Sequence, residues 1–335
     1  MTNKKVLLIH TGGTIGMSRD LKSGVLKPDI FYESLLNFIP ELNRIADLNI
    51  EIPFIIDSSE MTIEHLNKIV SIIKENGDKY AGVVITHGTD TLTYTASALS
   101  YMLMNVTFPV ILTGAQKPLS EIRSDARSNL INAIELSTMG INEVSIMFNN
   151  KLMRGNRTVK SHINNFDAFS SPNYPLLAKT GINIEVYRRN ILKQTGLFYI
   201  FDKFDNSVAV LKIFPGIDPT YFSPGEDIRA IIIIAYGAGT IPINNKKLKD
   251  KISNWIDSKK IVVLMSEVKG GTLAPSIYES GRELLEMGAI DSGDMTFEAS
   301  ITKMMFLLGQ YSDISKIKKN FSKSLAGEIT PEIKN

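Results

Sequence analysis

The stretch Lys-Val-Leu-Leu-Ile-His-Thr-Gly-Gly-Thr-Ile-Gly at residues 5–16 joins a short apolar run to a glycine turn that contains two threonines. The apolar run has the length and composition of a buried strand rather than of a helix. A second stretch, Gly-Val-Val-Ile-Thr-His-Gly-Thr-Asp-Thr at residues 82–91, has the same arrangement. We therefore predict two buried strands, each ending in a turn of glycine and threonine.

Short strand-like runs alternate with longer amphipathic segments over the first 150 residues. The predicted strands are Lys5–Ile9, Ile50–Ile56, Gly82–Thr86, Pro109–Thr113 and Val144–Phe148. The predicted helices are Asp29–Ile39, Thr62–Asn76 with Thr62 as N-cap, Thr91–Met104 and Ser124–Thr138. Strands that are apolar throughout and alternate with helices favour a parallel sheet covered on both faces.

After residue 150 this pattern stops and later resumes. Residues 151–175 contain a glycine, two prolines and many Asn and Ser residues, which predicts an extended loop. Residues 188–206 are irregular and polar, as expected of an interdomain connection. The second series has predicted strands Ser207–Phe214, Ala230–Ala235 and Ile261–Met265, and helices Lys246–Ser258, Ser276–Met287, Thr296–Leu308 and Asp313–Ser322. We predict two α/β domains, 1–188 and 207–335, joined by a linker of residues 189–206.

The composition excludes several classes of protein. The 335 residues include no cysteine, which removes disulfides, thiolate catalysis and Cys-based metal sites. Thirty-seven basic and 35 acidic residues give a net charge of +2, with no basic tract for nucleic acid. No apolar run approaches the roughly 20 residues of a membrane span, and the polar start is not a signal peptide. We expect a cytoplasmic protein that binds neither membrane nor nucleic acid.

Polar residues gather where the predicted strands end. Thr11 and Thr14 follow the first strand, and residues 57–59, 86–91 and 113–116 follow three others. In open α/β sheets, ligands bind at the carboxyl ends of the strands. Each turn alone is explained by helix capping, but four together favour a site for a polar small molecule. The glycines do not form G-x-G-x-x-G, so a dinucleotide site is not favoured.

A threonine hydroxyl becomes a nucleophile when a neighbouring group takes or orients its proton. There is no Ser-His-Asp arrangement, the four histidines lack metal-ligand spacing, and His10 and His87 are expected to be packed or hydrogen-bonded. A lysine is the alternative base, because burial can lower the pKa of a lysine toward neutrality. Lys160, in the polar stretch 154–160, is one candidate, and a solvated loop lysine is the other interpretation of this residue.

The chain resembles the bacterial-type L-asparaginases, in particular their cytoplasmic type I branch, over nearly its whole length. The motifs that carry the resemblance lie at residues 11–16, 82–91, 112–118, 154–160, 167–169 and 171–173. The resemblance implies a larger N-terminal domain, with a parallel or mixed sheet flanked by helices, and a smaller flavodoxin- or Rossmann-like domain. It also implies hydrolysis of asparagine to aspartate and ammonia without cofactor or metal, in a homotetramer built as a dimer of dimers.

The resemblance also implies roles for individual residues. Thr14 matches the nucleophile that forms a β-aspartyl ester. Thr89, Asp90 and Lys160 match a hydrogen-bonded trio that moves the proton. The positions that hold the α-carboxylate and α-amino groups of the substrate match Asp57, Ser58, Ser59 and Asp90. Backbone N–H groups near Thr89 and Ala115 match the oxyanion hole.

The sequence departs from the family pattern at several positions. Val25 stands where the mobile loop of the family carries a tyrosine that contacts the nucleophile, which predicts a low kcat. Thr240 stands where an asparagine is common. Ile234 and Val268 replace an arginine and a cysteine of the regulatory site in some type I members, so that regulation is not expected.

Two alternatives stay open at this point, and a third is set aside. A glutaminase-asparaginase acts on a substrate longer by one methylene, a difference that a pocket discriminates by roughly 1–3 kcal/mol. A binding or sensing relative would keep the pocket without turnover, as Val25 allows. An amidotransferase subunit acting on charged tRNA is less favoured, because we expect an N-terminal extension in such a protein and a less neutral charge.

Overall fold

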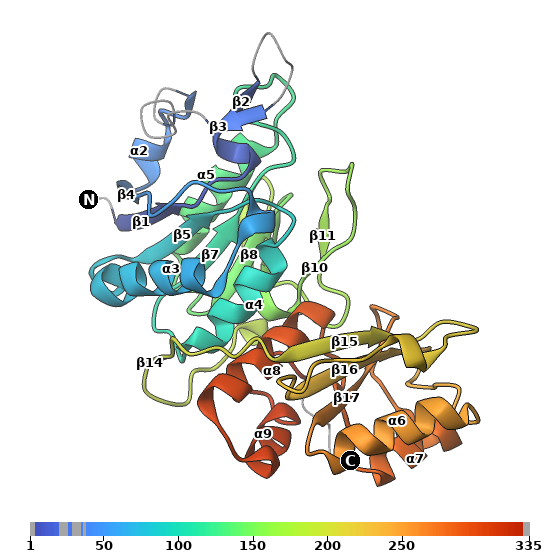
Figure 1. Cartoon of the computed structure of the whole chain (residues 1–335). Helices are drawn as coiled ribbons and strands as arrows, with labels where there is room; N and C mark the ends of the chain where they lie inside the picture. The colour runs from blue at the N-terminus through green and yellow to red at the C-terminus, as the bar shows by residue number, and fades with distance from the viewer. Residues whose placement is uncertain (1–3, 20–25, 29–34, 36–37, 331–335) are drawn as a thin grey trace. The chain divides into compact units, whose positions relative to one another are not determined.

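The computed structural model describes residues 4–19, 26–28, 35 and 38–330. Contacts between residues divide the chain into two compact units, Met1–Asp202 and Lys203–Asn335, each with its own sheet (Figure 1). The limits 1–188 and 207–335 remain a prediction for the parts that fold independently. None of the described helices is long and apolar enough to cross a membrane.

The first unit contains an eight-stranded mixed sheet in the order β13-β12-β9-β8-β7-β5-β1-β4. Five neighbouring strands are parallel, namely β4 (Asp47–Glu51), β1 (Lys5–His10), β5 (Gly82–Thr86), β7 (Val110–Thr113) and β8 (Val144–Phe148). The antiparallel strands are β9 (Lys151–Arg154), β12 (Ala178–Thr180) and β13 (Ile184–Val186). Because His10 pairs with Thr86 and Thr86 with Thr113, the central strands end at the same level.

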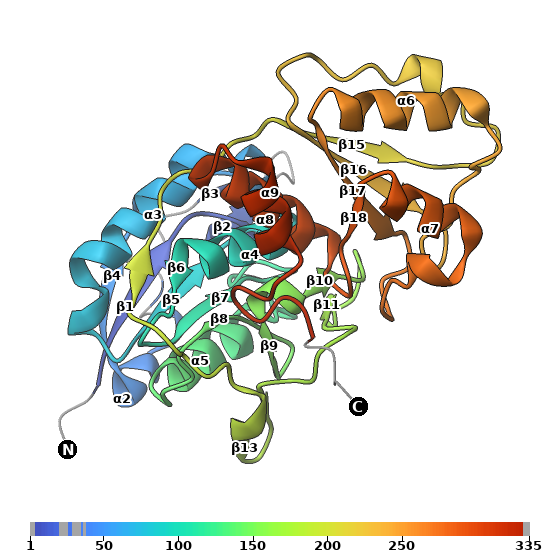
Figure 2. The same cartoon turned by 90° about the horizontal axis from the view of Figure 1, so that it is seen from below.

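Helices cover both faces of this sheet (Figure 2). On one face lie α3 (Ile63–Asn76) and α4 (Leu92–Met102), and on the other lie α2 (Leu42–Ile45) and α5 (Ala126–Ser137). The core under α5 joins Leu130 and Ala133 to Val6, Leu8 and Ile111 of the strands. As predicted, Thr62 is the N-cap of α3, where it forms a capping box with His65. The predicted covered sheet is therefore confirmed.

Shorter elements lie outside the large sheet. Three antiparallel pairs join β2 (Met17–Arg19) to β3 (Leu26–Pro28), β10 (Val159–Lys160) to β11 (Phe169–Ser170), and β6 (Leu103–Met104) to β14 (Tyr199–Ile200). The 3-10 turns of the unit are η1 (Thr14–Gly16), η2 (Ser58–Glu60), η3 (Gly77–Lys79), η4 (Gly155–Arg157) and η5 (Arg188–Asn190).

The second unit contains a parallel four-stranded sheet. Its strands, in spatial order, are β15 (Val208–Lys212), β16 (Ala230–Ala235), β17 (Ile261–Ser266) and β18 (Ile290–Asp291). Its helices are α6 (Lys246–Asp257), α7 (Glu279–Glu286), α8 (Phe297–Gln310) and α9 (Ile314–Phe321), with 3-10 turns η6 (Pro219–Tyr221) and η7 (Pro275–Ile277). The core packs Leu248, Ile252 and Trp255 of α6 with Ile233 and Leu264 of the strands.

Several predicted segments were wrong. The strand expected at Ile50–Ile56 is β4, Asp47–Glu51, an edge strand whose Asp47, Asn49 and Glu51 stay exposed, so the apolar run lies after it. The loop expected at 151–175 contains β9, which enters the large sheet through a tight turn from β8.

The turn between β8 and β9 explains why the sequence predicted a loop in place of β9. Asn149 and Asn150 both have positive φ, 45° and 63°, and so provide the left-handed hairpin turn for which glycine is the usual signal. The irregular stretch 188–206 contains η5 and β14. The helix predicted at Asp29–Ile39 lies largely outside the described residues.

A fully buried ion pair fixes the end of the second unit. Lys303 of α8 contacts Oε1 of Glu328 at 2.5 Å and donates to the carbonyl oxygens of Phe321 and Lys323. Both side chains are 0% exposed. Glu328 also accepts from the backbone N–H of Ala326 at 2.7 Å. The charge on each partner is therefore compensated only while the segment after α9 stays in place.

We expect Glu328→Gln to lower the free energy of unfolding of the second unit by about 3–5 kcal/mol, because it leaves a buried ammonium without its counter-charge. Urea unfolding followed by fluorescence measures this, since Trp255 is the one tryptophan and lies in α6. Glu283→Gln is the matched control, because Glu283 pairs with Lys249 where both are partly exposed. Equal midpoints for the two variants would contradict the prediction.

Candidate active site

The turn after β1 packs backbone against backbone on its neighbours. Gly12 and Gly13 have φ of +107° and +78°, a region that side chains disfavour. A Cβ on Gly12 would lie 2.4 Å from the carbonyl oxygen of Ile56, and a Cβ on Gly13 would lie 2.4 Å from the backbone nitrogen of Gly88. Only glycine therefore allows the turns after β1 and β5 to meet.

The neighbouring turns also meet at glycines, one against a side chain and one against backbone. A Cβ on Gly88 would lie 2.6 Å from Oγ of Ser58, and a Cβ on Gly114 would lie 2.4 Å from the carbonyl oxygen of His87. The turns after β1, β5 and β7 and the segment before η2 thus form one contiguous surface of backbone at the carboxyl edge of the sheet. The predicted convergence of these four turns is confirmed.

Side chains of the strand ends fasten this edge. The N–H and the hydroxyl of Thr11 both donate to the carbonyl oxygen of Thr86, at 3.1 and 2.9 Å. Oγ1 of Thr86 in turn lies 2.7 Å from Nδ1 of His10. Thr11 is buried and its hydroxyl is used within the sheet, whereas Thr14 is only partly buried.

The two histidines beside the turns are packed and hydrogen-bonded, as expected. His87 lies between the carbonyl oxygen of Gly88, 2.7 Å from Nδ1, and Oγ1 of Thr95, 2.9 Å from Nε2. Burial lowers the pKa of His10 and of His87 to about 4. Both rings are therefore neutral near pH 7, and their role is to support the strand ends.

These pKa values predict how stability depends on pH. Below pH 6.5 the unfolded chain binds a proton at each of the two histidines, whereas the folded chain does so only at about pH 4. The free energy of unfolding is therefore highest above pH 6.5 as far as these histidines determine it. It falls as the pH is lowered, by about 3 kcal/mol per histidine at pH 4. Hydrogen exchange of the β1 and β5 amides between pH 7 and 4 measures this loss.

His87→Gln should remove about half of that pH dependence, because it removes one of the two buried rings. His162→Gln is the control, since His162 is exposed on the loop between β10 and β11. If both variants keep the wild-type slope, the histidines are not its cause.

Lys160 brings the distant parts of the predicted trio together. Its Nζ donates to Oγ1 of Thr89 at 2.9 Å and to Oδ1 of Asp90 at 2.7 Å. The side chain of Lys160 is 19% exposed and that of Asp90 is 69% exposed. The pairing of β10 with β11 holds Lys160 opposite Phe169, which is buried, so the lysine is anchored at its backbone. The arrangement links an ammonium, a hydroxyl and a solvent-facing carboxylate.

Thr14 begins η1 directly after Gly13 and is partly buried. Gly13 packs against Gly88, the residue before Thr89. Thr14 and Thr89 thus each come directly after one of the two glycines that are in close backbone contact. The structure therefore brings Thr14 and the predicted trio to the same part of the sheet edge.

The segment Asp57–Ser59 presents a carboxylate and two hydroxyls. Asp57 caps η2, accepting from the N–H and from the hydroxyl of Ser59, each at 2.8 Å. These two hydrogen bonds lower the pKa of Asp57. Ser58 is buried, and its carbonyl oxygen accepts from the hydroxyl of Thr91 at 2.6 Å. The segment is thereby joined to the turn that contains Thr89 and Asp90.

Asp125 and Asn129, which no sequence pattern indicated as functional, hold the turn around Ala115. Asp125 accepts from the backbone N–H groups of Gln116 and Lys117, at 3.0 and 3.1 Å. Asn129 donates to the carbonyl oxygen of Gly114 at 3.0 Å. Only the position of Asp125 at the start of a helix was visible in the sequence, and that position predicts a cap.

The sequence departs from the family at four positions. Val25 lies outside the described residues. Thr240, Ile234 and Val268 belong to the second unit, whereas every predicted site residue belongs to the first. In the described part of the chain no group of His, Cys, Asp or Glu side chains is arranged to hold a metal ion.

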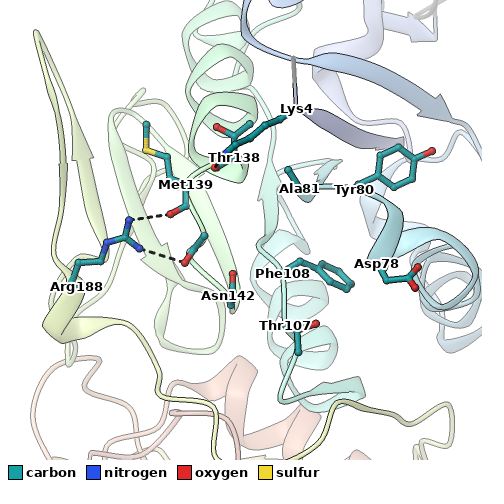
Figure 3. A pocket seen from close by; sticks show the side chains of 11 residues that line it. Lys4, Asp78, Tyr80, Ala81, Thr107, Phe108, Thr138, Met139, Asn142 and Arg188 are labelled. Carbon is teal, nitrogen blue, oxygen red and sulfur yellow. Dashed lines mark hydrogen bonds between the residues drawn. The ribbon is translucent and has the colours of Figure 1, made fainter. Parts of the chain in front are cut away.

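A cavity of about 770 Å³ opens at the opposite edge of the large sheet, lined by residues that precede β1, β5 and β7 (Figure 3). Two cations project there. Lys4 donates to the carbonyl oxygen of Thr138 at 2.6 Å, and Arg188 donates to those of Met139 and Gly140. These carbonyls directly follow the last residue of α5, Ser137, at the end where cations are favoured by the helix dipole. The cations are explained by this capping, and we assign no ligand to the cavity.

Known protein families and proteins are similar to this chain over both of its units. Residues 5–192 match the family model described as "Asparaginase, N-terminal", and residues 207–321 match "Glutaminase/Asparaginase C-terminal domain". L-asparaginase 1 of Escherichia coli (strain K12) is 40% identical over 341 residues, which cover 99% of this chain and 100% of that protein.

Two solved structures have the same fold. L-asparaginase I from Vibrio cholerae O1 biovar eltor str. N16961 has a TM-score of 0.87 and 37% identity, covering 98% of this chain and 100% of that chain. The thermostable L-asparaginase from Thermococcus kodakarensis has a TM-score of 0.89 and 33% identity, covering 98% and 99%. The resemblance carried by the strand-end motifs is confirmed, and the chain belongs to the asparaginase family.

Proposed function

We propose that this protein hydrolyses L-asparagine to L-aspartate and ammonia, with Thr14 as the nucleophile. The observation that supports this most directly is the bonding of Lys160 to Thr89 and Asp90, beside the backbone contact that brings the turn of Thr14 to the same edge. The similarity to proteins named L-asparaginase over the full chain supports the choice of substrate.

The proposed reaction has two halves. Oγ1 of Thr14 forms a bond to the side-chain amide carbon of asparagine, and its proton leaves toward Thr89 and Lys160 or toward a water. The carbon–nitrogen bond then breaks, and the nitrogen takes up a proton and leaves as ammonia, so that a β-aspartyl ester remains on Thr14. Water attacks the ester carbon, which releases aspartate and restores the hydroxyl.

Lys160 is the group through which the proton would pass. The carboxylate of Asp90 lies 2.7 Å from the ammonium of Lys160 and compensates its charge. When the α-ammonium of asparagine binds at Asp90, a second positive charge competes for that carboxylate. Binding of the substrate would thereby weaken the bond between Asp90 and Lys160.

The remaining predicted residues suit the two ends of the substrate. Asp57 and Asp90 offer carboxylates to the α-ammonium, and such charge-assisted bonds are the stronger ones. Ser58 offers a hydroxyl donor to the α-carboxylate, and Ser59 would do so by turning its hydroxyl away from Asp57, to which it donates. The backbone N–H groups near Thr89 and Ala115 would stabilise the oxyanion of the tetrahedral intermediate.

We further propose that the protein works in the cytoplasm as a homotetramer, a dimer of dimers, without cofactor or metal, and that the first unit carries the nucleophile. A broader glutaminase-asparaginase is the second candidate, since the C-terminal match is to a domain named for both activities. Ammonia release from asparagine and from glutamine, measured side by side over a range of concentrations, distinguishes the two. Tight asparagine binding without ammonia would instead identify a non-catalytic relative.

Thr14→Ala should lower kcat for asparagine by about three orders of magnitude or more, because no other group in the turn replaces the attacking hydroxyl. Coupled-enzyme detection of ammonia measures kcat, and circular dichroism with aspartate titration shows that fold and pocket persist. Thr107→Ala is the control, since Thr107 is exposed at the opposite edge of the sheet. Wild-type turnover in Thr14→Ala would exclude the proposed nucleophile.

Thr89→Val and Lys160→Met should each lower kcat/KM by about 100- to 10,000-fold, the range for one positioned proton-transfer group. The kcat/KM of the double variant should be only slightly lower than that of the less active single variant, because the two side chains form one hydrogen-bonded unit. Lys179→Met, at an exposed position of β12, should leave kcat/KM unchanged. Losses that add in the double variant would show that the two residues act separately.

A further inference from the structure

Among the contacts of the described residues, a side chain holds the peptide between Gly114 and Ala115 at its carbonyl oxygen. Nδ2 of Asn129 donates to the carbonyl oxygen of Gly114 at 3.0 Å. The carbonyl oxygen of Gly114 and the N–H of Ala115 belong to the same peptide unit, which is planar and trans. The two groups therefore point in opposite directions. A contact that fixes the carbonyl oxygen also fixes the direction of the N–H.

We propose that Asn129 is a positioning residue for the reaction, which acts by orienting and polarising the peptide whose N–H belongs to Ala115. This inference rests on the proposed function, in which that N–H stabilises the oxyanion. Asn129 draws the carbonyl oxygen toward α5, so the N–H is turned away from α5. A hydrogen bond accepted at the carbonyl also strengthens the N–H of the same peptide as a donor, because bonded amides polarise one another.

Asn129 is itself held at both ends of its amide. Its Nδ2 also donates to Oδ2 of Asp125 at 3.1 Å, and its Oδ1 accepts from the backbone N–H of Asn149 at 3.0 Å. The side chain is 1% exposed. An amide with both donors and its acceptor engaged has no freedom to turn. The orientation of the Gly114–Ala115 peptide is thereby tied to α5 and to the turn after β8.

Asp125 shows that this arrangement is not ordinary helix capping. It stands at the N-cap of α5, yet its side chain makes no cap hydrogen bond, and instead reaches back to Gln116 and Lys117. The side chain is 8% exposed, and burial raises its pKa although these hydrogen bonds oppose the rise. A local rule of helix formation is thus broken at a buried carboxylate, a pattern expected beside functional sites. The hydrogen bonds of Asp125 stabilise the turn around Ala115 in place of the start of α5.

The expected effect is on turnover rather than on binding. The oxyanion develops only in the transition state, so a misdirected donor lowers kcat and leaves the affinity for the ground state nearly unchanged. Removal of a whole oxyanion donor costs about 100- to 1,000-fold in kcat. Because Asn129→Leu misdirects the donor without removing it, we expect a loss of about 10- to 100-fold in kcat.

The test compares Asn129→Leu and Asn129→Ser with Asn132→Leu in the full-length protein. Asn132 lies on the same helix and donates to the side chain of Asn150, away from the Ala115 turn. For each variant, kcat and KM for asparagine, the Kd for aspartate and the melting temperature are measured. We expect kcat to fall in both Asn129 variants while KM and the aspartate Kd stay within about threefold, and Asn132→Leu to keep wild-type kcat.

Each other outcome decides against the proposal. Wild-type kcat in a folded Asn129 variant overturns it. An equal weakening of aspartate binding and of kcat, or failure of both Asn129 variants to fold, would show a purely structural residue. A wild-type protein that releases no ammonia overturns the proposed function instead, and it is recognised before any variant is made.

Discussion

Four positions without room for a Cβ determine how the candidate site is built. Gly12, Gly13 and Gly114 let the turns after three parallel strands, and the segment before η2, touch through their backbones, and Gly88 leaves room for the side chain of Ser58. A site assembled in this way needs little from side chains to bring its parts together. The chemistry-bearing residues then follow the glycines directly, so their places are set by peptide geometry and by the strand register rather than by flexible packing.

The part of the fold that could be predicted from the sequence is the part that is buried on all sides. β5 and β8 were predicted with their observed bounds because every residue in them is apolar or small and buried. β4 was misplaced because an edge strand exposes alternate residues, and this weakens its apolar signal. β9 was missed because asparagine rather than glycine makes its turn. An edge strand such as β4 and an asparagine turn such as the one before β9 are recognised only when the neighbouring strands are known.

The candidate site divides in the same way. The turns that hold Thr14 and Thr89 stand at strand ends, so position alone indicated them. Asp57 was indicated by a strand predicted to end at Ile56, whereas β4 ends at Glu51. Lys160 was reached by resemblance, since a two-residue strand in a polar stretch has no period of its own. Asn129 could not be found, because its partner is a backbone oxygen 15 residues earlier, and a backbone acceptor leaves no mark in a sequence. Supporting residues of this kind become visible only when both elements are placed.

The buried pair of Lys303 and Glu328 bears on the order in which the chain is made. During synthesis, α8 leaves the ribosome before residue 328 does, so Lys303 has no counter-charge while the intervening residues are still being added. An ammonium in that position keeps its water, which opposes closure of the core around α8. The second unit is therefore committed to its final packing late, whereas Thr14, Thr89 and Lys160 all belong to the unit that is synthesised first.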